Sequence, residues 1–335
     1  VRSPNAWELF EPETWYAGGT DVCANDPDTG VPQASLEECL RTGMTASQYG
    51  TVPPYGQIRG IWSGNLLLEP EVADTYTAGV VWTPPRVPGL SVTADYYTID
   101  IGGAITGVGA YSTVLLCART GDPEQCGRIH RDEYGSLFLT EDAYVDSSYQ
   151  NFQALGAEGV DLNAGYLVAL GDAGFLPIEL VGTYTLSRYI EDPLIGFDCA
   201  GYWGGWCGQA NPRWRHRLRA TWETAFNLDL SLAWRRVGSS KIDDASPDPD
   251  LADPDYMEIA RANDIDEIPA YDWFDLAVSY SFNDAVRVTL GINNILDEEP
   301  PLLPGWADAR GTWFNLYGNY DPLGRYIFAN VQLKF

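Results

Sequence analysis

Apolar and polar side chains alternate along the last eleven residues of the chain. Because successive side chains of a strand point to opposite faces, this alternation predicts one apolar and one mostly polar face. A free edge of this kind in a soluble sheet usually carries a charge, a proline or a bulge that prevents aggregation. Closure of a barrel removes the edge altogether. The pattern therefore favours a barrel strand, whose apolar face consists of Ile327, Ala329, Val331, Leu333 and Phe335.

The same alternation recurs in eight earlier segments of about ten residues. Tight turns and long polar segments alternate between them. An outer-membrane barrel needs strands of about 9 to 11 tilted residues, with short periplasmic turns and long outer loops. We therefore predict an all-β, antiparallel transmembrane β-barrel. Its nine strands are expected at residues 75–83, 90–101, 158–170, 176–188, 213–223, 227–237, 271–282, 286–294 and 325–335.

The remaining segments have weaker patterns. Residues 1–74 contain many chain breakers and little periodicity, so they are expected to form one long loop. A short helix is expected at residues 110–119, between the second and third strands. Two further loops are expected at residues 190–212 and 238–270, and the second of them is rich in aspartate.

Aromatic residues are frequent, with 12 Trp and 20 Tyr. Both types favour places where one end of the side chain is apolar and the other is wet, as at a membrane interface or a glycan surface. The alternative is therefore a secreted, aromatic-rich β-sandwich that binds glycans. The regular alternation of loop lengths favours the barrel. Its interfacial girdles are expected to contain Trp82, Trp214, Trp222, Trp234 and Trp273.

Charge and motifs exclude several functions. The chain has 20 basic and 47 acidic residues and a net charge of −27, which repels phosphate groups and argues against nucleic acid as a partner. The longest uncharged stretch, residues 101–118, contains four glycines and is too weakly apolar for a spanning helix. The sequence has no GxSxG motif, no HExxH motif and no phosphate loop. No enzymatic activity is predicted.

The six cysteines form three close pairs along the sequence. This clustering predicts disulfides between Cys23 and Cys39, Cys117 and Cys126, and Cys199 and Cys207. The surrounding Gly, Pro and Asp residues indicate loops stapled in an oxidising compartment. Zinc binding is the alternative, but the two histidines, His130 and His216, are not close to a pair, so no metal site is predicted.

Short segments resemble the TonB-dependent outer-membrane receptors. RSPN at residues 2–5 and ELFEP at 8–12 are similar to the family's entry into a large extracellular loop, and GNLLLEPE at 64–71 to the segment before the next strand. NNILD at 293–297 resembles the end of the penultimate strand, and YDPLGR at 320–325 the start of the terminal strand. The matches are in the right order and span the chain.

The sequence departs from the family pattern at two places. Ser3 stands where Ala is more usual, and Leu66 and Leu67 stand where a proline and a polar residue are common. These differences leave the resemblance intact and are compatible with a subfamily that has its own ligand.

The resemblance implies a larger protein. Members have an N-terminal plug domain, an energy-coupling box that contacts TonB and a barrel of about 22 strands. This chain is therefore expected to be the C-terminal part of the barrel, with the plug domain and the first strands absent and with residues 327–335 unpaired on one side. In the family, the terminal strand ending at Phe335 is recognised by the barrel-assembly machinery.

The resemblance also implies a function in the outer membrane of a Gram-negative bacterium. Family members import a scarce ligand, often a ferric siderophore and sometimes haem, cobalamin or a glycan, with energy supplied through TonB. The expected partners are the TonB complex, reached through the absent N-terminal region, outer-membrane lipid and lipopolysaccharide, the barrel-assembly machinery and the ligand. No cofactor is expected, although the transported ligand can contain iron.

A row of four arginines is the first candidate ligand site. Arg213, Arg215, Arg217 and Arg219 share one face of a predicted strand, opposite Trp214, Leu218 and Trp222, and are thus expected to face the lumen. Spaced about 6.6 to 7 Å apart, four guanidinium groups can attract an anionic ligand. Alternatively, they pair with Glu179, Glu223, Asp229 or acidic groups of the plug, because buried charges need partners.

Two loops supply further candidates. Tyr202, Trp203 and Trp206 lie beside the Cys199 to Cys207 pair, where rigid aromatic rings can stack on a catecholate or a sugar. The alternative is that this glycine-rich loop packs on itself. The acidic segment 243–255 has oxygen ligands suitable for Ca²⁺, but its spacing matches no EF-hand and a solvated loop is favoured.

Overall fold

The computed structural model describes residues 1–26, 29–52, 57–191, 195–301, 319–321 and 323–334. The chain divides into two compact units. Unit 1 comprises Val1–Asp74, Ile101–Leu155 and Glu191–Gly196, and unit 2 comprises Thr75–Asp100, Gly156–Ile190 and Phe197–Phe335. Among the described residues, no helix has the length and apolar character needed to cross a membrane.

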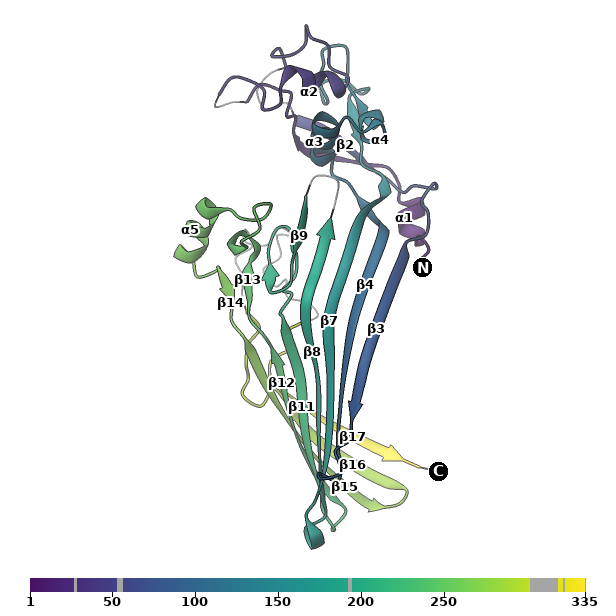
Figure 1. Ribbon diagram of the computed structural model, residues 1–335, viewed down its shortest axis with the longest axis vertical. Coiled ribbons are helices and arrows are strands. Elements are labelled where there is room, and N and C mark those ends of the chain that lie inside the picture. The colour runs from purple at the N-terminus through teal and green to yellow at the C-terminus, as the bar shows by residue number, and fades with distance from the viewer. Residues whose placement is uncertain (27–28, 53–56, 192–194, 302–318, 322, 335) are drawn as a thin grey trace. The chain divides into compact units, whose positions relative to one another are not determined.

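One large sheet contains the nine predicted strands (Figure 1). Its order is β17-β16-β15-β12-β11-β8-β7-β4-β3, and the short strand β9 (Gly196–Asp198) pairs with β8. The strands span β3 (Val72–Trp82), β4 (Leu90–Gly107), β7 (Tyr149–Ala169), β8 (Phe175–Glu191), β11 (Trp214–Glu223), β12 (Leu228–Val237), β15 (Tyr271–Asn283), β16 (Val286–Asn293) and β17 (Tyr326–Leu333). A single continuous order of strands is typical of a barrel wall, so the sandwich alternative is wrong.

The expected strand length is wrong for three strands. β4, β7 and β8 have 18, 21 and 17 residues, where the predicted ranges 90–101, 158–170 and 176–188 span 12, 13 and 13. Glycines and polar residues dilute the alternation at residues 102–107 and 149–157, so the sequence pattern revealed only the apolar part of β4 and β7.

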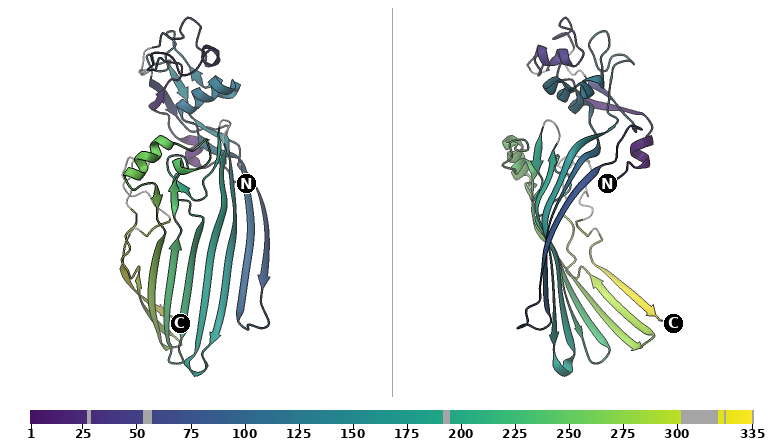
Figure 2. Two further views of the ribbon diagram at one scale, coloured as in Figure 1. Left: turned by 60° about the vertical axis from the view of Figure 1, so that its left-hand side comes forward. Right: turned by 45° about the vertical axis from the view of Figure 1, so that its right-hand side comes forward.

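Short turns join alternate strands, as predicted. The turn between β7 and β8 contains the 3-10 helix η1 (Gly171–Ala173), and residues 224–227 and 284–285 connect the next two hairpins. Figure 2 shows these turns at one end of the sheet. Gly174 ends the first turn with a positive φ of 100°, and a Cβ there would lie 2.0 Å from the carbonyl oxygen of Glu223. Only glycine fits this position.

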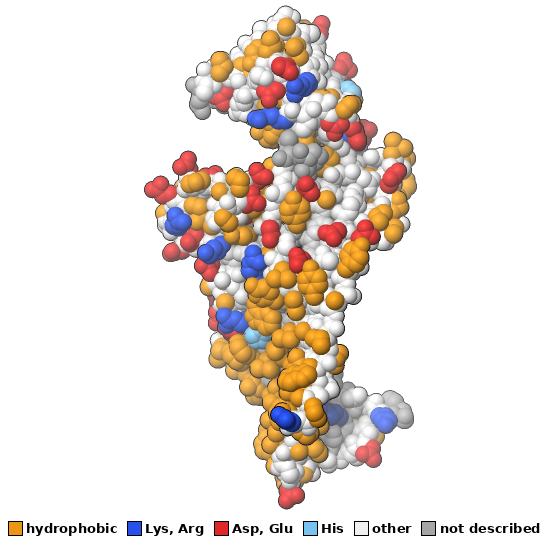
Figure 3. Space-filling view, in the orientation of Figure 1, with side chains coloured by type: hydrophobic (Ala, Val, Ile, Leu, Met, Phe, Trp, Pro, Cys, Tyr) orange, Lys and Arg blue, Asp and Glu red, His pale blue; other side chains and the backbone are white. Residues whose placement is uncertain are grey.

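The strand register separates an apolar face from a polar one. Leu218 lies opposite Trp234, which in turn lies opposite Phe274. Hydrophobic side chains gather over the lower part of the sheet on the face seen in Figure 3. Trp214, Trp222 and Trp234 share the apolar face, as expected for girdle residues. Trp273 does not, because it pairs with Arg235 on the polar face and is buried.

The terminal strand β17 pairs with β16 from Tyr326 to Leu333. Within the part of the chain that the structure describes, β17 has no second neighbour in the sheet order, as predicted. Phe335 lies outside the described residues, so its role as an assembly signal stays a prediction.

The prediction of one long loop at residues 1–74 is wrong. This part of unit 1 contains α1 (Ala6–Phe10), β1 (Thr14–Thr20), α2 (Leu36–Arg41) and β2 (Gln57–Trp62). The helices are too short to show a 3.6-residue period, but capping boxes mark both of them. Asn5 pairs with Glu8 in the first box and Ser35 with Glu38 in the second, a pattern readable from sequence.

The second segment of unit 1 completes its core. It contains α3 (Ala110–Thr120), which confirms the predicted helix, together with α4 (Pro123–Gly127), β5 (Ile129–His130) and β6 (Tyr144–Asp146). A four-stranded sheet has the order β1-β2-β6-β5. Residues from both segments, including Ile58, Val114 and Val145, form one buried cluster.

All three predicted disulfides are present. Their expected position in loops is only partly right, because Cys39 belongs to α2, Cys117 to α3 and Cys126 to α4. In unit 1, two disulfides and a buried ion pair between Asp21 and Arg131 hold short elements together.

The two loops of unit 2 are also structured. β10 (Tyr202–Trp203), β13 (Ser240–Ile242) and β14 (Glu267–Ile268) form a small sheet. The 3-10 helix η2 (Asp243–Ala245) and α5 (Pro254–Ala262) occupy the acidic segment, which is therefore not simply a solvated loop. A second buried cluster includes Trp203, Ile242 and Trp273.

Candidate ligand-binding site

Strand β11 presents the row of arginines on one face. Its neighbours are β8 and β12, and Arg217 lies opposite Val181 on the first and Arg235 on the second. Arg215 and Arg217 are exposed and Arg219 is half-buried. Arg213 precedes the strand and donates from Nη1 to the carbonyl oxygen of Leu186 at 2.8 Å.

The arginines do not pair with Glu179, Glu223 or Asp229, and pairing with acidic groups of the plug stays a prediction. Within the described part of the chain, the side chains of Arg215, Arg217 and Arg219 have no hydrogen bond or ion pair, and Arg219 Nε is buried without an acceptor. Asp229 instead pairs with Arg287. Three guanidinium groups on one face thus keep their hydrogen-bonding capacity for another partner.

We call a hollow of about 290 Å³ on this face the arginine pocket. Arg215 and Arg217 line it together with Arg235, Trp273 and Asn319. A guanidinium fork matches carboxylates and other paired oxygen anions because it donates two parallel hydrogen bonds. The pocket therefore combines positive charge with an indole that is only 1% exposed.

Arg235 is fixed within the arginine pocket, unlike the arginines of the row. Its guanidinium bonds Asp275 at 2.8 Å and Asp321 at 3.3 Å, and its Cζ lies 5.5 Å from the centre of the Trp273 ring. These contacts neutralise Arg235 and hold the indole in place. Arg236, which also lines the pocket, pairs with Asp272 at 2.6 Å, so the unpaired positive charge of the pocket comes from Arg215 and Arg217.

A neighbouring hollow, the loop pocket, brings the two predicted candidates together. Arg213 from the row and Tyr202 from the Cys199 to Cys207 loop line it with Lys241, in a volume of about 380 Å³. Lys241 follows Ser240 in β13, which pairs with β10 in parallel. Arg213 borders this pocket and Arg215 borders the arginine pocket, so the start of β11 connects the two.

The stapled loop, residues 199–207, is anchored by Asp243. The buried carboxylate of Asp243 accepts hydrogen bonds from the backbone N–H groups of Trp206 at 2.8 Å and Cys207 at 2.9 Å. Gly204 makes room for it, because a Cβ at Gly204 would lie 2.0 Å from Asp243 Oδ1. The acidic segment and the aromatic loop, predicted as separate sites, therefore form one assembly.

The loop aromatics have different surroundings. Trp203 is 1% exposed and packs in the core, where its ring is closed to a ligand. Trp206 is 57% exposed and makes an edge contact with Phe197, with ring centres 6.0 Å apart. Self-packing therefore applies to Trp203, while Trp206 and the half-buried Tyr202 remain accessible.

The acidic segment has one carboxyl group with a strongly shifted pKa. Burial, followed by the charge of Asp243, raises the pKa of Asp244 to about 6. In the described residues, no group of three or more His, Cys, Asp or Glu side chains is placed to hold a metal ion.

The lining residues that were not predicted as site residues include Arg235, Lys241, Trp273 and Asn319. Arg235 was within reach of sequence reasoning, because the short turn after Glu223 fixes the hairpin register that places it opposite Arg217. Lys241 is one of only two lysines in the chain, and Trp273 was placed on the wrong face. Asn319 carries no sequence signal.

Comparison with known proteins identifies the family. The family described as TonB dependent receptor-like, beta-barrel matches residues 25–295. The chain belongs to this family. The resemblance of the short segments to TonB-dependent receptors is thereby confirmed. No curated protein matches the chain.

Solved receptors share the fold at low sequence identity. A double mutant of the ferric enterobactin receptor PfeA from Pseudomonas aeruginosa is 15% identical, with a TM-score of 0.56 over 99% of this chain and 36% of its own. The siderophore receptor PirA from Acinetobacter baumannii is 15% identical, with a TM-score of 0.51 over 83% of this chain and 34% of its own. The chain spans about a third of the length of these receptors.

Proposed function

We propose that this chain contributes part of the barrel wall of an outer-membrane receptor that imports an anionic iron–siderophore complex. Membership in the receptor family supports the transport role, and the siderophore receptors that share the fold support the type of cargo. TonB supplies the energy through regions of the receptor that this chain does not include. Lipid contacts the apolar face of the sheet, and the barrel-assembly machinery recognises the terminal strand.

The unpaired arginines carry this proposal. In a chain with a net charge of −27, Arg215 and Arg217 face one pocket without an acidic partner in the described residues. Siderophores hold iron(III) through oxygen donors, and complexes with catecholate groups carry net negative charge. Charge-assisted hydrogen bonds from the two guanidinium groups can bind such oxygens.

The test uses the complete receptor in cells that depend on it for iron. Replacing Arg215 and Arg217 with Gln removes two charged donors while keeping side-chain length. Each lost charged hydrogen bond costs about 1.5 to 3 kcal/mol, so the affinity for the iron-loaded siderophore is expected to fall about 100-fold or more. Equilibrium binding and uptake of radioactive iron measure the effect.

A matched control separates local from general charge effects. Arg86→Gln removes a positive charge from the exposed turn between β3 and β4, away from either pocket, and is expected to leave binding unchanged. Normal affinity of the double variant at low and high salt would contradict the anionic cargo. A neutral cargo would then be favoured.

A further inference from the structure

A third hollow lies in unit 1, on the sheet face that does not pack on the core. β1 pairs with β2, with Trp15 opposite Ile61 and Ala17 opposite Arg59. On the opposite face of these strands, Ile58 belongs to the buried cluster of unit 1 and Tyr16 packs against it. Trp15, Ile61 and Arg59 thus line the outer face, in a hollow of about 510 Å³.

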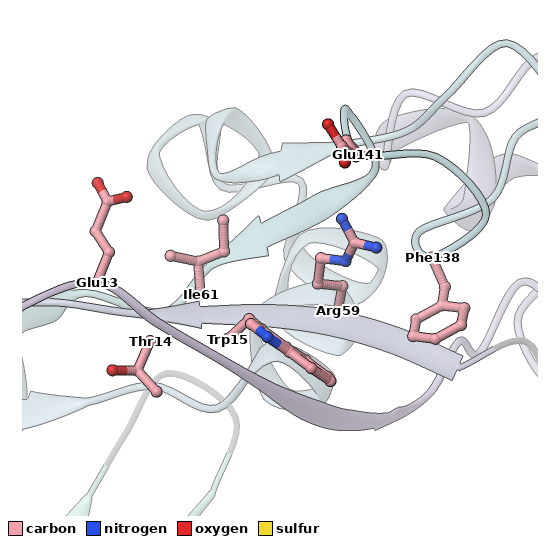
Figure 4. A pocket seen from close by; sticks show the side chains of 7 residues that line it. All are labelled: Glu13, Thr14, Trp15, Arg59, Ile61, Phe138 and Glu141. Atoms are coloured by element: carbon pink, nitrogen blue, oxygen red, sulfur yellow. The ribbon is translucent and has the colours of Figure 1, made fainter.

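The hollow combines apolar surfaces with three charged groups (Figure 4). The indole of Trp15 is 68% exposed although it sits on a hydrogen-bonded strand. Arg59 stacks on Phe138, with its Cζ 5.7 Å from the ring centre. Figure 4 shows Glu13, Ile61 and Arg59 projecting to the same side, and Glu141 facing Arg59 from a neighbouring segment.

The three charged side chains have unused hydrogen-bonding capacity. Glu13, Arg59 and Glu141 make no side-chain hydrogen bond or ion pair within the described residues. A second backbone contact fixes the position of β2 here, because the N–H of Arg59 donates to the carbonyl oxygen of Leu137 at 3.0 Å. The hollow therefore offers two carboxylates as hydrogen-bond acceptors and one guanidinium group as a donor, beside a strand that backbone hydrogen bonds hold in place.

The composition of the hollow disfavours most ligand classes. Two carboxylates and the net charge of −27 repel an anion, and Arg59 weakens the attraction of the carboxylates for a simple cation. A purely apolar ligand would desolvate three charged groups without giving them partners, which is costly. A neutral molecule with one apolar face and several hydroxyl groups satisfies every lining group.

We propose that this hollow binds an uncharged pyranose of an oligosaccharide. The C–H face of the sugar stacks on Trp15, and neighbouring hydroxyl groups donate to Glu13 and Glu141 and accept from Arg59. This glycan site is separate from the arginine pocket and differs from it in charge. It holds the receptor to a glycan and does not concern the imported cargo.

The test measures oligosaccharide binding to the complete receptor by saturation-transfer NMR. The probes are maltohexaose, cellohexaose and mannohexaose, with sialyllactose as an anionic sugar and a glycine–phenylalanine dipeptide as a zwitterion. The detergent must lack a sugar head group. At least one neutral probe is expected to bind, and added salt is expected to leave its affinity unchanged.

Variants distinguish the proposed contacts. Trp15→Ala is expected to weaken binding about tenfold or more, because it removes the stacking surface. Trp7→Ala changes another exposed tryptophan of unit 1 and is expected to have no effect. Replacing Glu13 and Glu141 with Gln keeps hydrogen-bonding oxygens and is expected to cost only a few-fold.

Three outcomes would overturn the proposal. The first is that no neutral probe binds, and the second is that Trp15→Ala and Trp7→Ala behave alike. The third is preferential binding of sialyllactose or of the dipeptide. Iron uptake is not part of this assay, so its result is independent of the proposed cargo.

Discussion

Removing the Asp243 carboxylate is expected to release the stapled loop. Asp243 is 1% exposed, and Asp243→Ala leaves the N–H groups of Trp206 and Cys207 without an acceptor. Each charge-assisted hydrogen bond contributes about 1.5 to 3 kcal/mol, so the anchored state loses about 3 to 6 kcal/mol. The Cys199 to Cys207 disulfide still closes the loop but no longer holds it against η2.

Hydrogen exchange measured by mass spectrometry on the complete receptor tests this loss. A change of 3 kcal/mol corresponds to about a 100-fold increase in the opening equilibrium of residues 199–211. Ligand affinity is expected to fall as well, because Tyr202 lines the loop pocket. A thiol assay on the variant establishes that the disulfide is intact.

Two further variants complete the experiment. Asp243→Asn keeps one acceptor oxygen and is expected to give an intermediate exchange rate. Asp255→Asn removes an exposed carboxylate of the same acidic segment, and its exchange is expected to match that of the parent. If exchange in Asp243→Ala stayed within about threefold of the parent, the anchoring role of this carboxylate would be refuted.

Two other predictions concern stability. Arg131→Met breaks the ion pair between Arg131 and Asp21, whose side chains are only 2% and 1% exposed. It is expected to lower the free energy of unfolding of unit 1 by about 3 to 5 kcal/mol. Adding Asp21→Leu should recover part of this loss. Proteolysis of unit 1 is the readout and is expected to be fastest in the single variant and slower in the double variant. Because the pKa of Asp244 is raised from 3.8 to about 6, the folded segment binds a proton more tightly than the unfolded one. The stability of the segment is therefore expected to fall as pH rises from 4 to 6. Hydrogen exchange of residues 238–262, corrected for intrinsic pH effects, should show this trend in the parent and lose it in Asp244→Asn. An unchanged trend in the variant would contradict the role of Asp244.

Strand alternation was the most reliable guide to this fold. Nine strands were predicted because burial on one face forces a period of two, and that period persists wherever lipid or a core covers the apolar side. The structure of unit 1 could not be predicted from alternation. Its helices have five to eleven residues and its strands are short, so tertiary packing and disulfides determine them more than any local period does.

The candidate site was only partly readable for a similar reason. Arg215 and Arg217 were predicted to share a face because alternate residues of one strand point to the same side. Lys241 lines the same pocket as Arg213 because β13 pairs in parallel with β10, a contact between segments that no local pattern encodes. Burial of Trp203 likewise depends on residues far along the chain, such as Met257.

The three disulfides each join cysteines that are near neighbours in sequence, at separations of 16, 9 and 8 residues. Closing such small rings restricts little of the chain, and no ring encloses a strand of the large sheet. Oxidation can therefore precede insertion without fixing which strands meet. The order in which the strands pair is then determined by the hairpins. A polypeptide whose loops are already cross-linked can still insert into the membrane strand by strand.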